Sequence, residues 1–94
     1  MEYLKISWLH RFDDEPVFLY SEIDAQRFEN RKVEIYPDGS FGIANCNFHF
    51  GGTALSDMIM PGIEEISEDK QFIPELISQA EFELIWNQYF YFLS

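Results

Sequence analysis

The fold is decided by residues 27–47, which read RFENRKVEIYPDGSFGIANCN. The first half, residues 27–36, is predicted to be a β-strand, with Arg31, Val33 and Ile35 on one face and Asn30, Lys32, Glu34 and Tyr36 on the other. Pro37-Asp38-Gly39 then gives the strongest turn signal of the chain, because proline presets φ for a turn and glycine adopts a positive φ without steric cost. Residues 40–47 are predicted to return antiparallel, so the whole stretch is a β-hairpin.

A second hairpin is predicted upstream of the first. Residues 3–10 alternate with period 2 and indicate a strand with one buried face, and residues 17–22 form another run of strand-forming side chains. Between them, residues 12–16 (FDDEP) form an acidic turn whose proline cannot donate a ladder hydrogen bond. Residues 23–26 are expected to connect the two hairpins.

The C-terminal segment is predicted to be an amphipathic helix. Ser78 and Glu81 form a capping box, in which each side chain satisfies a backbone N–H of the first turn. Apolar residues then follow at helical spacing and are expected to pack on the sheet: Phe82, Ile85, Trp86, Tyr89, Phe90 and Leu93. Tyr91 and Phe92 lie off this stripe, so we expect some aromatic surface to stay exposed at the C-terminus.

These segments together predict an α+β fold in a single domain, residues 1–94. Its core element is an antiparallel β-sheet of four to five strands, made of two hairpins and a candidate edge strand at residues 64–67, and the C-terminal helix packs on it. Residues 48–62, with Gly51-Gly52-Thr53, read as a loop and an apolar segment ended by a turn.

Composition indicates a folded protein with a strongly acidic surface. The 94 residues are 47% hydrophobic and 18% aromatic, which is unlike a disordered acidic tail. The N-terminus lacks the pattern of a signal peptide, no apolar run approaches the roughly 20 residues of a membrane helix, and the single cysteine suits a reducing compartment. We therefore expect a cytoplasmic protein.

The acidic residues are unevenly distributed. The chain holds 17 acidic against 6 basic residues, a net charge of −11. The carboxylates concentrate in residues 12–30 and 61–94, whereas residues 31–60 are nearly balanced. Such a field disfavours nucleic acid and anionic membranes and speeds association with a basic protein. Arg27 and Arg31 are expected to share one strand face and to be neutralised by Glu29, Glu34 or the 13–15 loop.

No arrangement of residues carries an enzyme signature, and we expect neither catalysis nor a cofactor or metal. Cys46 and His49 form one close pair, whereas structural zinc needs four ligands. Asp13-Asp14-Glu15 lacks the spacing of a calcium loop, which makes it a solvated turn. Cys46 is predicted to be a small core residue at a strand end, and His10 a packed or hydrogen-bonded side chain.

A family resemblance covers most of the chain. Its motifs are W-x-H-x-F-D-D-E-P-V at 8–17, Y-S-E-I-D at 20–24, R-x-E-x-R-K-V-E at 27–34, D-G at 38–39, G-G-T at 51–53, E-E-I at 64–66 and I-S-x-x-E-F-x-x-I-W at 77–86. The chain resembles an uncharacterised family of small acidic bacterial proteins. In size, acidity and α+β layout it is similar to the immunity proteins of polymorphic toxin systems, including contact-dependent growth inhibition.

The resemblance implies a toxin-neutralising immunity protein that binds and blocks a basic toxin domain, an RNase or DNase, in the cytoplasm. The carboxylates expected to contact this partner lie in two patches: Asp13, Asp14, Glu15, Glu22 and Asp24, and then Glu64, Glu65, Glu68 and Asp69. The alternative is a small acidic regulatory, adaptor or DNA-mimic protein that binds a host protein. A third interpretation, an enzyme with scattered carboxylates, predicts a concave pocket with perturbed carboxylates.

Overall fold

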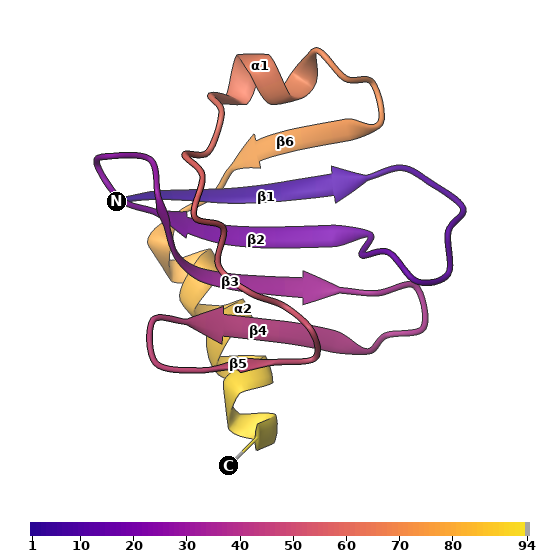
Figure 1. Ribbon diagram of the computed structural model, residues 1–94, viewed down its shortest axis with the longest axis vertical. Helices are drawn as coiled ribbons and strands as arrows, with labels where there is room; N and C mark the ends of the chain where they lie inside the picture. The colour runs from indigo at the N-terminus through magenta and orange to yellow at the C-terminus, as the bar shows by residue number, and fades with distance from the viewer. Residues whose placement is uncertain (94) are drawn as a thin grey trace.

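The computed structural model describes residues 1–93 and shows one antiparallel sheet between two coverings (Figure 1). The strand order is β5-β4-β3-β2-β1-β6. In chain order the elements are β1 (Glu2–Trp8), β2 (Phe18–Ile23), β3 (Glu29–Ile35), β4 (Phe41–Asn45), β5 (His49–Phe50), α1 (Ile63–Ser67), β6 (Phe72–Leu76), α2 (Gln79–Phe90) and the 3-10 turn η1 (Tyr91–Leu93). The predicted α+β fold with a C-terminal helix on an antiparallel sheet is confirmed, but the sheet has six strands rather than four or five.

Both predicted hairpins are present. β1 pairs with β2 from Glu2↔Ile23 to Ser7↔Phe18, and β3 pairs with β4 from Arg31↔Asn45 to Ile35↔Phe41. The turn between β3 and β4 closes with a 2.9 Å bond from the Gly39 N–H to the Tyr36 carbonyl, and Gly39 has a φ of 86°. The glycine therefore supplies the left-handed conformation that this turn requires.

The edge strand predicted at residues 64–67 is wrong. These residues belong to helix α1, because Ile63 and Ile66 stand at a helical i, i+3 spacing and Glu64 and Glu65 suit the positive end of a helix. The sheet has two edge strands, β5 and β6. β5 lies within residues 48–62, where a loop and an apolar segment are predicted, and β6 pairs with β1 in a register that places Lys5 opposite Glu75. Pro74 is tolerated in β6 because the strand lies at the edge of the sheet.

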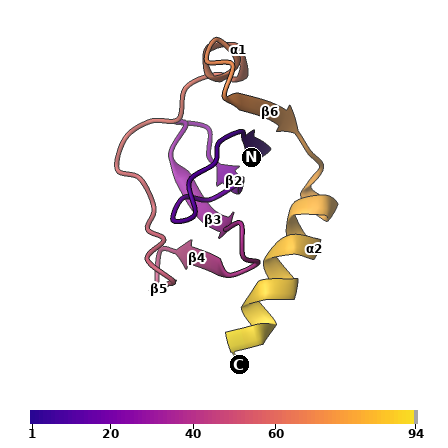
Figure 2. The same ribbon diagram turned by 90° about the vertical axis from the view of Figure 1, so that its right-hand side faces the viewer.

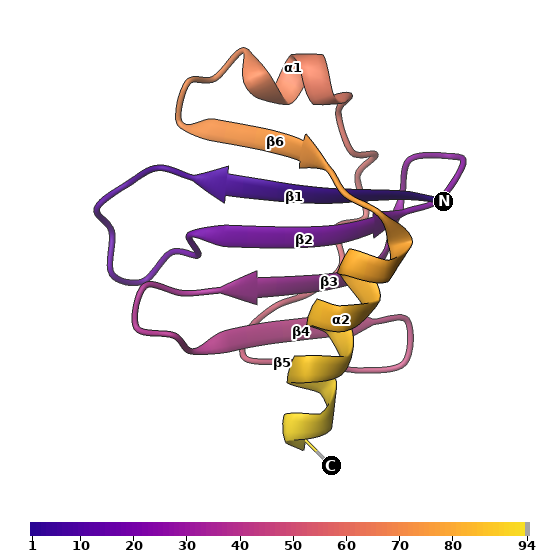
Figure 3. The ribbon, with the colours of Figure 1, turned by 180° about the vertical axis from the view of Figure 1, so that it is seen from behind.

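Helix α2 covers one face of the sheet. Its N-cap is Ser78, whose hydroxyl accepts a 3.1 Å hydrogen bond from the Glu81 N–H, as the capping box predicted for the serine. Phe82 and Trp86 are buried on this face against Tyr3, Tyr20, Val33 and Ile43. Figure 3 shows α2 crossing the strands at the end where β1 begins, so the opposite end, with loops 9–17 and 36–40, is left uncovered.

The second face of the sheet is also buried, which corrects the prediction of a single buried face. Leu4 and Ile23 are fully buried on it, and residues 51–62 run along this side, opposite α2 (Figure 2). Hydrogen bonds hold the segment there: Thr53 donates to the Glu34 carboxylate at 2.6 Å, and the Ser56 N–H donates to Glu29 at 2.8 Å. A loop without regular structure thus acts as the second layer.

Arg27 anchors the end of this segment. It lies before β3 with a φ of 73°, so it does not share a strand face with Arg31 as predicted. Its guanidinium donates to the carbonyls of Met60 and Pro61 and pairs with Glu2 at 2.9 Å. The predicted ion pairs of Arg27 with Glu29, Glu34 or the 13–15 loop are therefore replaced by one with Glu2.

The packing of residues 51–62 can be tested at Gly42. A Cβ atom on Gly42 would lie 1.7 Å from Thr53 Oγ1 and 2.7 Å from Thr53 Cβ, and Thr53 is buried. Gly42→Ala should lower the free energy of unfolding by about 2 kcal/mol or more, the cost of overpacking a filled site. Gly62→Ala is the matched control, because a Cβ atom at position 62 meets nothing within 4 Å. The substitution changes only the N-cap residue of α1 and should lower the free energy of unfolding by less than about 1 kcal/mol. Urea unfolding measures both, and equal losses would contradict this packing.

Candidate functional site

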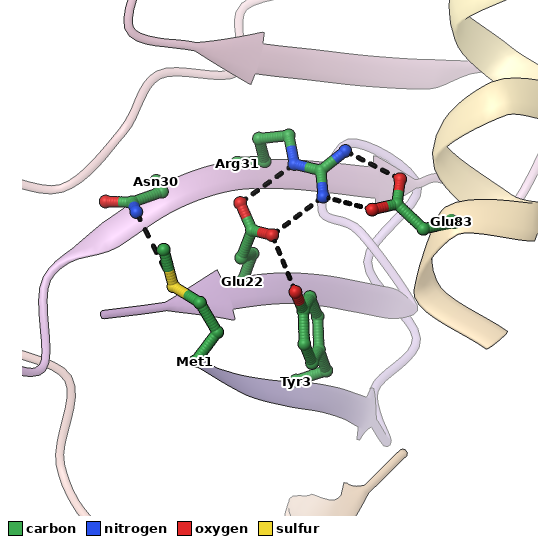
Figure 4. Close-up of polar contacts among 6 residues, drawn as sticks. All are labelled: Met1, Tyr3, Glu22, Asn30, Arg31 and Glu83. Atoms are coloured by element: carbon green, nitrogen blue, oxygen red, sulfur yellow. Dashed lines mark hydrogen bonds and ion pairs between the residues drawn. The ribbon is translucent and has the colours of Figure 1, made fainter. Parts of the chain in front are cut away.

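A partly buried ion network joins the sheet to α2. Arg31 on β3 makes two hydrogen bonds with Glu22 on β2, at 2.8 and 2.7 Å, and two with Glu83 on α2, at 2.8 and 2.7 Å (Figure 4). The Tyr3 hydroxyl donates a further bond to Glu22 at 2.9 Å. The Arg31 guanidinium also lies over the rings of Phe82 and Trp86, 4.9 and 5.1 Å from their centroids.

The network is structural, and it removes Glu22 from the predicted partner-binding patch. Glu22 is only 7% exposed, and hydrogen bonds from Arg31 hold its pKa and that of Glu83 below the ordinary value. Burial and the hydrogen bond to Glu22 raise the pKa of Tyr3. Arg31 is thus paired across the sheet and to the helix, not with Glu29, Glu34 or the 13–15 loop.

Asp24 also has a structural role, in the turn between β2 and β3. Its Oδ1 accepts hydrogen bonds from the backbone N–H groups of Gln26 and Phe28, both at 3.0 Å, and so shapes the turn between β2 and β3. This turn lies at the end of the sheet opposite the 13–15 loop (Figure 1). The first predicted patch is therefore divided, since Asp13, Asp14 and Glu15 stand apart from Glu22 and Asp24.

Asp13 and Asp14 line an open groove of about 740 Å³. We call it the acidic groove. Its charged members are Asp13, Asp14 and Asp38, and its aromatic members are Tyr36, Phe41, Phe50, Tyr89 and Phe92; Gly39, Ser40 and Gly51 complete the lining. The groove is formed by the two loops at the uncovered end of the sheet, by β4 and β5, and by the C-terminal end of α2 with η1.

The aromatic side of the acidic groove is built around Phe41. Its ring centroid lies 4.8 Å from that of Tyr89, 5.4 Å from Phe50 and 6.1 Å from Phe92. Phe50 is 45% exposed and Phe92 is 77% exposed, which confirms the prediction of an exposed aromatic surface at the C-terminus. Exposed rings of this size beside a concavity are typical of interaction sites.

The electrostatic field in the acidic groove is negative. Asp38 accepts hydrogen bonds from the Ser40 N–H and hydroxyl, and these bonds lower its pKa, so it is ionised at neutral pH. Burial raises the pKa of Tyr36, and the negative charges of Glu34 and Glu15 raise it further. Glu15 thus acts on a residue of the groove without lining it.

Sequence reasoning missed Asp38 because it treated the residue only as part of a turn. The available signal was topological: β1 and β3 run in the same direction in a meander, so the loops that follow them meet at the same end of the sheet. The rings of Tyr89 and Phe92 lie at this end of the sheet because of where α2 packs, and the sequence pattern does not indicate that position.

The second predicted patch lies at the other edge of the sheet. Glu64, Glu65 and Glu68 are exposed on or directly after α1, and Asp69 is exposed in the turn to β6. Glu65 and Asp69 border a cavity of about 360 Å³, lined mainly by apolar side chains and by the pair Glu29–Lys32. Glu29 accepts hydrogen bonds from Ser21, Lys32 and the Ser56 N–H, so its carboxylate already has partners within the protein.

The residues considered for catalysis or metal binding lie elsewhere. Cys46 is exposed in the turn after β4, which corrects its prediction as a core residue, because the strand ends at Asn45. His10 is hydrogen-bonded as predicted, with Nε2 2.8 Å from the Pro16 carbonyl oxygen. Within residues 1–93 no three His, Cys, Asp or Glu side chains gather as a metal site would require.

The fold and the acidic groove define a small α+β protein that presents carboxylates beside exposed aromatic rings. Residues 2–91 match a family described as a domain of unknown function (DUF6881), and the chain belongs to this family. Neither the curated proteins nor the solved structures include a match to the chain. Of the helices in residues 1–93, none has the length and apolar character to span a membrane.

The Arg31 network can be tested by removing its cation. Arg31→Met leaves the buried Glu22 carboxylate without an ion-pair partner and with only the hydrogen bond from Tyr3. We expect the free energy of unfolding at about pH 7 to fall by about 3 kcal/mol. Arg11→Met, at an exposed loop arginine, is the control and should change it by less than about 0.5 kcal/mol. Urea unfolding followed by tryptophan fluorescence gives both values, and a loss no larger than that of the control would contradict the role of the network.

The same network predicts acid sensitivity. Glu22 and Glu83 have pKa values below the ordinary 4.5, so their stabilisation is complete above about pH 4.5 and is lost as the pH falls through their folded-state values. Glu83→Gln should therefore flatten the decline of the free energy of unfolding below that pH, whereas Glu68→Gln, at an exposed site, should leave the decline unchanged. Parallel declines in Glu83→Gln and the wild type would refute the assignment.

Proposed function

We propose that this chain is a cytoplasmic, toxin-neutralising immunity protein that binds and blocks a basic bacterial toxin domain, a nuclease. The observation that carries the proposal is the acidic groove, in which carboxylates without ion pairs in residues 1–93 stand beside exposed aromatic rings. The resemblance to immunity proteins supplies the class of partner. The groove supplies the surface on which such a partner would bind.

The charge that the protein offers a partner is large. Within residues 1–93 the ion pairs engage only Glu2, Glu22, Glu29 and Glu83 of the 17 acidic residues. Most of the remaining carboxylates are exposed and can steer a positively charged protein, an effect that raises association rates and weakens with salt. Nuclease active sites are basic because they hold phosphates, so an acidic surface can occupy them.

Affinity would come from the centre of the interface rather than from total charge. Binding energy concentrates in a few desolvated aromatic and charged side chains, surrounded by contacts that exclude water. Phe92 and Phe50 are exposed rings that a partner can bury, and Asp13, Asp14 and Asp38 line the same groove. The patch at α1 lacks exposed aromatic rings among its carboxylates, so we assign it to long-range steering.

Charge reversal tests the proposal. The product of the gene directly upstream should co-purify with this chain, and its nuclease activity should be inhibited in a salt-dependent manner. The triple variant Asp13→Lys/Asp14→Lys/Asp38→Lys should weaken inhibition at least about tenfold, because each reversal turns attraction into repulsion at the interface. Glu64→Lys/Glu65→Lys/Glu68→Lys makes the same change in net charge at the distant patch and should weaken it much less.

Two outcomes would overturn the proposal. One is a neighbouring gene product that this chain neither binds nor inhibits. The other is inhibition that responds to neither triple variant at any salt concentration. Retention of a housekeeping protein in place of the neighbouring product would instead favour the adaptor or DNA-mimic alternative.

A further inference from the structure

We infer that the acidic groove is an arginine-recognition site, in which a guanidinium of the partner stacks on the Phe41–Phe92 rings and bonds to the aspartates of the groove. The inference deepens the proposed function and rests on it only for the identity of the partner. The groups that line the groove resemble those of an arginine site inside the protein itself.

The internal site is that of Arg31. Its guanidinium lies over two aromatic rings, Phe82 and Trp86, and is held edge-on by carboxylates from two different elements. The acidic groove contains the same two kinds of group, aromatic rings and carboxylates from separate loops, without a guanidinium of its own. This combination of groups suits a planar cation, because such a cation can stack on an aromatic ring and donate hydrogen bonds to carboxylates at the same time.

Arginine fits the acidic groove better than lysine does. The ammonium of lysine is a compact and strongly hydrated charge, so it must give up hydrogen bonds to water before it can lie against an aromatic ring. A guanidinium can donate its in-plane hydrogen bonds to carboxylates while its flat faces stack on the aromatic rings.

A metal ion fits the acidic groove less well than a guanidinium. Asp13, Asp14 and Asp38 do not converge as a cluster of three ligands, according to the geometry of residues 1–93. The aromatic rings between them supply no oxygen ligands of the kind that calcium or magnesium needs. An organic cation that spans several ångströms can reach separate carboxylates and cover the rings as well.

The size of the acidic groove indicates more than one side chain. Its volume of about 740 Å³ falls in the range of ligand sites and exceeds the space of a single arginine. The occupant is therefore an exposed arginine-bearing segment of the partner, whose neighbouring residues cover Phe50 and Phe92.

Peptide binding tests the inference without the partner. The probes are a blocked Gly-Arg-Gly-Arg-Gly peptide and its lysine counterpart, titrated into the full chain and followed by backbone amide shifts. We expect shifts at residues 13–14, 36–41, 50–51 and 89–92 and tighter binding of the arginine peptide. Phe92→Ala should weaken the arginine peptide about two- to fivefold and the lysine peptide less, the loss of one stacking contact. Because Phe92 is 77% exposed, the variant should keep its fold.

Charge variants complete the test. Asp14→Asn/Asp38→Asn should weaken the arginine peptide more than Phe92→Ala does, whereas Glu64→Gln/Glu68→Gln should leave it unchanged. Equal binding of the two peptides, shifts that centre on α1, or an unaltered dissociation constant in Phe92→Ala would each refute the inference.

The inference and the proposed function fail separately. If the groove variants lose the arginine peptide but still inhibit the neighbouring nuclease, the proposed function stands and the groove is not where the partner's arginine binds. If the peptide binds as expected but no neighbouring protein is inhibited, arginine recognition stands and the immunity function falls.

Discussion

The bonding of Arg31 to Glu22 and Glu83 is the interaction on which the rest of the structure depends. It joins β3 to β2 within the sheet and both strands to α2, while the guanidinium also covers Phe82 and Trp86. Hydrophobic burial alone would allow α2 to slide or rotate over a flat aromatic surface, because burial is not directional. The hydrogen-bonded ion pairs of Arg31 are directional, and they tie Glu83 in the first half of α2 to β2 and β3.

The position of α2 on the sheet determines what the surface offers. Because α2 covers the end of the sheet where β1 begins, the opposite end remains open, and the last turn of the helix lies beside the start of β4. Tyr89 and Phe92 are thereby placed against Phe41, beside two loops that carry aspartates. The acidic groove is thus a consequence of how the helix is held, although none of the residues that hold it lies in the groove.

The other face of the sheet is covered by an irregular segment, residues 51–62, instead of a helix. Leu4 and Ile23 are covered on the side along which residues 51–62 run, and backbone and side-chain hydrogen bonds to Glu29, Glu34 and Arg27 hold this segment in place. A small domain must cover as much of its sheet as it can, since it has little volume in which to bury apolar surface. Here several carboxylates are used as acceptors for a loop, so part of the acidity of the chain is structural and never reaches a partner.

The sequence by itself determined the local elements: both hairpins, the Pro37-Asp38-Gly39 turn, the Ser78 cap, the helix after it and the exposure of its final aromatic residues. Each follows from periodicity or from the φ preference of a few neighbours, which are short-range constraints. The tertiary structure alone decided that Glu22 is buried, that Asp38 joins Asp13 and Asp14, and that β5 and β6 form the edges of the sheet. Those outcomes depend on contacts between segments that are distant in the sequence. A local sequence pattern does not indicate which charged or aromatic side chain from another segment a residue will contact.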